Sequence, residues 1–280
     1  FGGILSTQHM NTRASIFRKG TRVSFSGTNT NYNWRTMATH NSGLMANGWA
    51  YSVSASRRWA QEGFFEGTDY GANSFFAAVE KRIGDKHAIN FTSILAQNSR
   101  GKNSPNTQEV TDIAGVEYNS YWGWQNGKKR NSRDKDVQEP IMILSHYWKI
   151  SDRSNLQTNV SFQTGTVSNS RIDYQNAPNP DPTYYRNLPS YYTSQYNGLT
   201  WVGNSPENQA LAANALFLSN RQIDWDRIYQ TNQNTADGNS VYVLYEDRTD
   251  DTQWSVNTLY STQLTDNIAF NGGATFRSLR

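Results

Sequence analysis

The sequence predicts an all-β protein in which antiparallel strands run up and down around a transmembrane barrel. Three observations support this fold class. Apolar and polar residues alternate with a period of two along most apolar segments, as the two faces of a strand require. The connections between these segments alternate between short and long. The longest unbroken apolar runs have five residues, whereas a membrane-spanning helix needs about 20.

Each predicted strand depends on this alternation. In residues 49–59, Trp49, Val53 and the other odd positions are mostly apolar, while the even positions are small or polar. The nine predicted strands are 21–28, 34–41, 49–59, 73–82, a segment around Ile89 and Phe91, 141–150, 156–166, 254–264 and a segment from Ile268 to Phe276. Pro140 opens one strand and the other six prolines lie in loops, so none would interrupt a ladder of hydrogen bonds.

The connections are of two kinds. The short ones are 43–48, 83–86, 151–155 and 264–267, and they are rich in the Gly, Asn and Asp that tight hairpins require. The long ones are 60–72, 98–139 and 169–253. Apart from 29–33, the two kinds alternate, which predicts short turns at one end of the strands and long loops at the other.

Two segments of the long loops are predicted to be helical. Ser104 and Ser205 are each followed by a proline, which is the pattern of an N-cap residue before the first helical position. The first helix would end at Ala114, before a glycine. The second would continue to Leu218 with an apolar stripe on one side.

The composition of the two strand faces bears on the environment of the sheet. Trp49 and Trp59 lie ten residues apart on one face, which spans about 23 Å along the membrane normal for a strand tilted near 45°. This matches the apolar band of an outer-membrane barrel, with Trp49, Trp59 and Trp254 as its aromatic girdle. The opposite face is small, polar and mostly uncharged, which suits a wet lumen. A soluble all-β module, with the apolar face inside, remains the alternative.

Nine strands cannot close an antiparallel barrel, because such barrels have an even strand number in bacterial single chains. An open sheet would leave two free edges. We therefore expect these strands to be part of a larger barrel.

The residue types do not favour an enzyme. The chain has no cysteine, and its four histidines are scattered without the spacing of a metal site, so neither a catalytic site nor a cofactor is predicted. The net charge of +3 is too small to imply a nucleic-acid partner.

The long loops carry the best candidates for ligand contact. Their aromatic residues are Tyr121, Trp122, Trp124, Tyr184, Tyr185, Tyr191, Tyr192 and Trp201. Aromatic rings among Asn and Gln suit stacking on sugars or packing on peptides, and the alternative is that they hold the loops together. The basic run 127–133 could contact lipopolysaccharide phosphates or lie in solvent.

Six short sequence motifs occur along the chain, and their order and spacing are characteristic. They are Phe1-Gly2-Gly3-Ile4, 11–15 (Asn-Thr-Arg-Ala-Ser), 48–52 (Gly-Trp-Ala-Tyr-Ser), 56–59 (Ser-Arg-Arg-Trp), 119–124 (Asn-Ser-Tyr-Trp-Gly-Trp) and 176–185 (Asn-Ala-Pro-Asn-Pro-Asp-Pro-Thr-Tyr-Tyr). The series resembles TonB-dependent outer-membrane receptors of the SusC-like kind and covers most of the chain. The resemblance implies that residues 1–20 are the end of a plug and the start of the barrel. Residues 21–280 would be the first nine or so strands of a 22-stranded barrel with long extracellular loops.

The resemblance also implies a function. The protein would be a multi-pass β-barrel of the cell outer membrane that takes up a nutrient such as a glycan or a peptide. Its partners would be the rest of the barrel and plug, TonB with its inner-membrane motor, a SusD-like surface lipoprotein, and lipopolysaccharide or lipid. The alternative is a structural barrel subunit of a larger outer-membrane assembly, without transport of its own.

Overall fold

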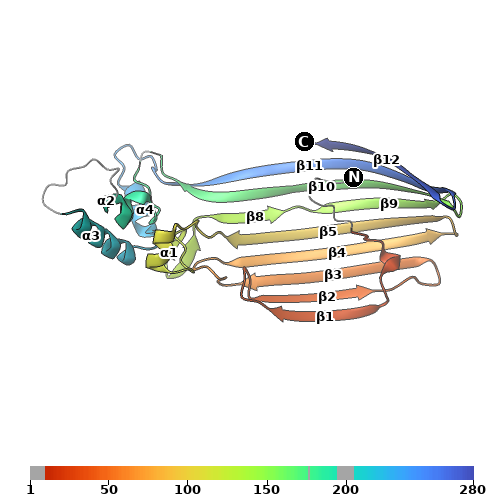
Figure 1. Ribbon diagram of the computed structural model, residues 1–280, viewed down its shortest axis with the longest axis horizontal. Helices are drawn as coiled ribbons and strands as arrows, with labels where there is room; N and C mark the ends of the chain where they lie inside the picture. Colours follow the sequence, from red (N-terminus) through yellow and green to blue (C-terminus); the bar gives the residue numbers. More distant parts are fainter. Residues whose placement is uncertain (1–9, 176, 194–204) are drawn as a thin grey trace.

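The computed structural model describes residues 10–175, 177–193 and 205–280. The strands in this part of the chain are β1 (Gly20–Gly27), β2 (Trp34–Asn41), β3 (Trp49–Ala60), β4 (Tyr70–Ile83), β5 (His87–Gly101), β6 (Trp122–Gln125), β7 (Lys128–Asn131), β8 (Asp134–Gln138), β9 (Ile141–Lys149), β10 (Ser154–Asp173), β11 (Val243–Thr265) and β12 (Ile268–Leu279). All except the β6–β7 hairpin form one antiparallel sheet in sequence order (Figure 1). The all-β prediction and the up-and-down strand order are confirmed.

Strands β8 and β9 occupy one position in the sheet, because both pair with β5 on one side and β10 on the other. Pro140 lies between them and cannot donate to a ladder. The sequence predicted β9 but placed β8 inside the loop 98–139, which is wrong. Residues 134–138 contain one apolar side chain, Val137. An alternation of apolar and polar residues therefore cannot be recognised in this strand from the sequence.

The hairpin of β10 and β11 extends further than predicted. It pairs continuously from Ser154 opposite Thr262 to Asp173 opposite Val243, so the connection is residues 174–242 and not the predicted loop 169–253. Residues 246–253 of β11 have no apolar side chain on either face, and threonine hydroxyls form cross-strand pairs such as Thr164 with Thr252 at 3.2 Å. The alternation of apolar and polar residues stops at this polar stretch, although the backbone pairing of β10 with β11 continues through it.

The short and the long connections lie at opposite ends of the sheet, as predicted. Figure 1 shows the turns after β2, β4, β9 and β11 at one end of the sheet, and all four α-helices at the other. These helices are α1 (Gln108–Ala114), α2 (Pro189–Thr193), α3 (Pro206–Ser219) and α4 (Trp225–Gln233). No helix in the described ranges is both long and apolar enough to cross a membrane.

The two predicted helices are present with one correction. Helix α3 begins at Pro206, and its N-cap Ser205 accepts a hydrogen bond from the backbone N–H of Asn208. Helix α1 ends at Ala114 as predicted, but it begins at Gln108 because Thr107, not Ser104, caps it. The Ser104 hydroxyl instead donates to Asn106 at 2.8 Å.

The helices and the β6–β7 hairpin form a compact module, which we call the loop cap (residues 102–133 and 177–242, as far as described). One small core joins Val110, Tyr118, Leu188 and Phe217, and a second joins Ile223, Trp225 and Ile228. Gly123 touches the Ile223 carbonyl so closely that a Cβ atom would not fit. The long loops are therefore packed against one another through buried side chains.

The two faces of the sheet differ in the side chains that they bury and expose. We call the face on which residues 12–17 lie the inner face and the opposite one the outer face. On the inner face Ser52 and Asn90 are buried. On the outer face the apolar side chains of Val53, Phe91 and Val256 are 44%, 43% and 41% exposed. The predicted division of apolar and polar residues between the two faces is confirmed.

Candidate functional site

A buried carboxylate lies on the inner face near the short-turn end of the sheet. Glu80, in β4, is completely buried beneath a short 3₁₀ helix, η1 (Ala14–Ile16). The Arg13 guanidinium donates to both Glu80 oxygens, with Nη2 at 2.6 Å from Oε1 and Nε at 3.4 Å from Oε2. The backbone N–H and hydroxyl of Ser15 donate to the same carboxylate at 3.2 and 2.9 Å. This ion pair is fully hydrogen-bonded, which is what allows a charge to be buried.

Neighbouring inner-face residues extend the same docking site. The Ala14 N–H donates to Asn90 Oδ1 at 3.2 Å, and the Thr92 hydroxyl lies 3.1 Å from that of Thr12. The Ala14 methyl group packs on Ala50 and Ala78, whose small side chains let the segment approach the sheet. The alternation of alanine, serine and asparagine on the inner face thus fits one chain segment.

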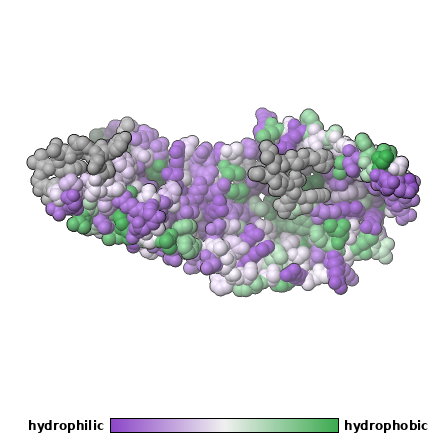
Figure 2. Space-filling model, viewed as in Figure 1, coloured by the Kyte–Doolittle hydropathy of each residue, from purple (hydrophilic) through white to green (hydrophobic). Residues whose placement is uncertain are grey.

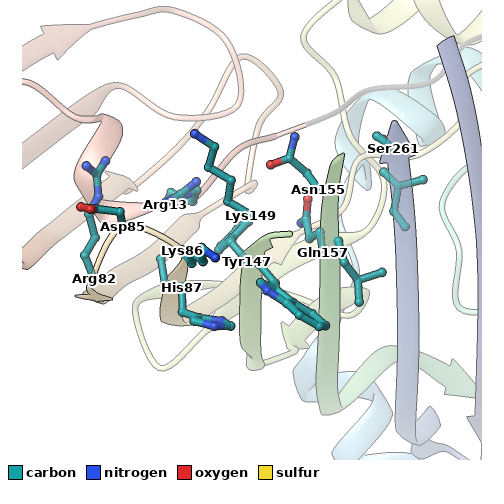
Figure 3. A pocket seen from close by; sticks show the side chains of 15 residues that line it. Arg13, Arg82, Asp85, Lys86, His87, Tyr147, Lys149, Asn155, Gln157 and Ser261 are labelled. Atoms are coloured by element: carbon teal, nitrogen blue, oxygen red, sulfur yellow. The ribbon is translucent and has the colours of Figure 1, made fainter. Parts of the chain in front are cut away.

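A pocket of about 440 Å³ opens beside this docking site. Figure 3 shows its side chains arriving from the β4–β5 turn on one side and from β9, β10 and β11 on the other. Arg13, Arg82, Lys86 and Lys149 make its lining largely basic. Arg82 Nε lies 3.9 Å from Glu80, and Lys149 pairs with Asp152 at 2.6 Å, so part of this charge is neutralised.

The first group of predicted ligand-binding aromatics lies in the β6–β7 part of the loop cap. Trp122 is only 4% exposed and packs edge-on against Trp124, which is 56% exposed, with ring centroids 5.6 Å apart. Lys129 Nζ lies 4.5 Å from the Trp122 ring and 2.6 Å from Glu62. Burial acts to raise the pKa of Glu62, but hydrogen bonds from Lys129 and Gly67 outweigh it and hold that pKa below its usual value. Trp122 thus packs inside the cap, whereas Trp124 is open to solvent.

Two tyrosines near this group are also partly or fully buried. The Tyr118 hydroxyl donates to the Arg221 carbonyl at 2.7 Å, and burial strongly raises the pKa of Tyr118. The Arg133 guanidinium lies 4.6 Å from the ring centroid of Tyr121, one of the predicted ligand residues. Burial raises the pKa of Tyr121 as well. Both hydroxyls therefore stay protonated at neutral pH.

The second group lies on the 3₁₀ helix η2 (Tyr185–Asn187) and on α2. Tyr184, Tyr185, Tyr191 and Tyr192 form a chain of edge-to-face rings with successive centroid distances of 4.7, 5.5 and 5.2 Å. Tyr185 is 52% exposed. Trp201 lies outside the described residues. The four tyrosines therefore form one aromatic patch, which we call the tyrosine patch.

The loop cap brings the two groups into one module. The Thr183 hydroxyl donates to Ser120 at 3.4 Å, next to Tyr121. Ser190, next to Tyr191, donates through its N–H and hydroxyl to Glu109 of α1 at 2.8 and 2.7 Å. The cap can therefore present Trp124 and the tyrosine patch on a single ordered support.

The predicted girdle residues lie on the outer face. Trp49 and Trp254 are exposed, and Trp59 is half-buried opposite Trp34 in the next strand. The structure adds Trp34, which stacks on Phe25 at 5.4 Å, and Trp148, which stacks on His87 at 5.7 Å. Within the described ranges, no three His, Asp or Glu side chains converge in the manner of a metal site.

Sequence reasoning missed Glu80 as a functional residue. The available signal was a single carboxylate among small residues on one strand face, in the sequence Ala78-Val79-Glu80. Its partner Arg13 is 67 residues away in the chain, so the pair is visible only once the strands are in register.

We expect Arg13→Ala to release residues 12–17 from the inner face. The variant leaves the Glu80 carboxylate buried without its main partner, which costs about 3 kcal/mol. Amide hydrogen exchange of Ala14 and Ser15 should then accelerate by roughly a hundredfold. Arg18→Ala, an exposed residue beyond η1, is the matched control. Unchanged exchange at Ala14 in Arg13→Ala would contradict the anchoring role.

Comparison with models of known protein families gives no match, and a search of curated proteins finds no similar sequence. The functional assignment of this chain therefore depends on its own residues and on the geometry described above.

Proposed function

We propose that this chain forms part of the barrel domain of a TonB-dependent, SusC-like outer-membrane receptor that takes up a nutrient such as a glycan or a peptide. One observation carries the proposal, namely the reversal of the two faces of the sheet. Polar side chains are buried on the inner face, and large apolar side chains are exposed on the outer face. Lipid is the environment in which this arrangement is stable.

Exposed apolar side chains lie on the outer face from the first strand of the sheet, β1, to the last, β12. They are Val23, Phe25, Trp34, Tyr51, Val53, Phe75, Val79, Ile89, Phe91, Met142, Leu144, Trp254, Val256, Phe270 and Phe276. Each large apolar side chain left in water forfeits about 1.5–3 kcal/mol. Soluble monomers rarely expose contiguous apolar patches larger than a few hundred Å². Contact of the outer face with lipid removes this cost.

The edges of the sheet support a larger barrel. In the described chain β1 pairs only with β2, and β12 pairs only with β11. A free edge in a membrane leaves backbone N–H and C=O groups without partners, and only closure of the sheet satisfies them all. Further strands between β12 and β1 would close it.

The inner face and the loop cap favour a receptor over a barrel that has only a structural role. A receptor of this kind needs a plug held inside the barrel, and residues 12–17 are tied to the inner face by the Arg13–Glu80 pair. It also needs an ordered outer rim to grip a ligand or a surface lipoprotein. Trp124 and the tyrosine patch provide exposed rings on such a rim.

The lipid-facing assignment can be tested with a pair of lysine substitutions in β3. Val53→Lys should lower the free energy of unfolding in liposomes by about 2–4 kcal/mol, because the charge would enter the apolar band. Ser56→Lys, on the inner face of the same strand, should cost much less. The shift between folded and unfolded bands in a urea-titrated gel measures both. Small and equal losses would contradict lipid contact, since an exposed valine in water tolerates lysine.

Uptake distinguishes the receptor from a structural barrel subunit. Deleting the gene in the producing cell should abolish growth on the nutrient as sole carbon source, and so should loss of TonB, because transport needs energy from the inner membrane. Growth on glucose serves as the control. A structural subunit predicts the opposite pattern: normal nutrient uptake with increased sensitivity of the envelope to detergent.

A further inference from the structure

A set of basic residues crosses the inner face at the end near the loop cap. Arg35 lies directly opposite Arg58 in the β2–β3 pair, and Arg100 lies directly opposite Lys135 in the β5–β8 pair. Arg171 follows on β10, two residues beyond Asn169, which is the partner of Lys135. The period of two places Arg58 on the same face as the buried Ser52, and Arg100 on the same face as Asn90. We call these five residues the inner basic band.

The band has no acidic partners among the described residues. None of its five members lies within 4.0 Å of a carboxylate oxygen there. The Nε atoms of Arg35 and Arg58 are buried and lack any hydrogen-bond partner. The guanidinium of Arg58 lies 5.8 Å from the Tyr32 ring centroid, and that of Arg171 lies 5.0 Å from the Tyr245 ring centroid. Aromatic rings therefore flank the guanidinium groups of Arg58 and Arg171, whereas Arg35 Nη2 donates to the Met37 sulfur at 3.3 Å.

Further positive charge lies close by. Burial lowers the pKa of Lys102, and the nearby charges of Lys135, Arg133 and Arg100 lower it further. Like charges repel one another, so their approach raises the free energy of this region unless an anion compensates them. Asp136 lies opposite Ser99 on the outer face, and the inner-face carboxylates of Asp173 and Asp247 form no ion pair within 4.0 Å with the five residues of the band.

The dimensions of the band point to an extended ligand. It reaches from β2 to β10, which is five strand spacings or about 24 Å. A single phosphate or carboxylate ion could contact only one end of it. Tyr70, Asn98 and Asn169 lie between the charges on the same face, and rings and amides of this kind suit the faces and hydroxyl groups of sugars. Figure 2 shows hydrophilic surface over the part of the molecule next to the loop cap.

We infer that the inner basic band binds an acidic oligosaccharide, whose carboxylate or sulfate groups pair with the arginines while its sugar rings lie on the intervening tyrosine and asparagine side chains. This inference rests on the proposed receptor function and names the substrate class of that receptor. Guanidinium groups bind carboxylates and sulfates through two parallel hydrogen bonds, which gives strength and orientation. Such a ligand would supply the counter-ions that the five residues of the band lack within 4.0 Å in the described chain.

Titration calorimetry on the full-length protein in detergent tests the inference. The probes are oligogalacturonate, a neutral maltooligosaccharide of equal length, and an oligoglutamate peptide. Oligogalacturonate should bind best, and added salt should weaken its binding because screening acts on exposed charges. The double variant Arg35→Gln/Arg58→Gln should bind it at least about tenfold more weakly. Arg35→Lys/Arg58→Lys keeps the charge and should recover part of the affinity.

Arg57→Gln is the matched control, because Arg57 is adjacent to Arg58 but lies on the outer face, where it donates to Asn73 at 3.0 Å. It should bind the probe normally. Equal binding of the neutral probe, or equal losses for Arg57→Gln and the double variant, would overturn the inference. Tighter binding of oligoglutamate would replace the saccharide with an acidic peptide. If binding fails while gene deletion still abolishes uptake, the receptor function stands and only the ligand class is wrong.

Discussion

The separation of apolar and polar side chains onto opposite faces of every long strand is the constraint on which this structure depends. The backbone N–H and C=O groups of a strand form hydrogen bonds with the two neighbouring strands. The side chains on its two faces then determine which environment each face contacts. Here the apolar face is the exposed one, from Val23 in β1 to Phe276 in β12. The side chains of the polar face are small enough for other parts of the chain to pack against it, as Ala14 does on Ala50 and Ala78. That property determines the rest of the architecture.

Two regions of the inner face differ in what lies against them. Near the short turns, alanine and serine allow residues 12–17 to approach, and Glu80 is buried because Arg13 and Ser15 satisfy its oxygens. Near the loop cap, arginines replace the small residues, and none of them forms an ion pair within 4.0 Å with a carboxylate of the described chain. The first region is a finished internal contact. The second is a basic surface without ion pairs in the described chain, and it is there that we propose an anionic ligand binds.

Hydrophobic alternation was enough to predict the strands of the apolar band, because each of them has one apolar and one polar face. It failed in β8, which has one apolar side chain, and along residues 246–253 of β11, which have none, although the ladder continues there and Thr166 donates across it to Asp250. Loop aromatics posed a different difficulty. Trp122 and Trp124 are two residues apart in similar surroundings, yet one is buried and one exposed, and no periodicity in a loop distinguishes them. Contacts such as Arg13 with Glu80 require the register of several strands.

Spin-label accessibility along β3 tests the central claim most directly, because the chain has no cysteine and each position can be labelled singly. Labels at residues 51 to 56, in liposomes, would be exposed to oxygen, which concentrates in lipid, and to a water-soluble nickel complex. A lipid-facing outer face predicts oxygen maxima at Tyr51, Val53 and Ala55 and nickel maxima at Ser54 and Ser56, whereas the buried Ser52 should be less accessible to nickel. High accessibility to the nickel complex at Val53 would place the outer face in water and contradict the account.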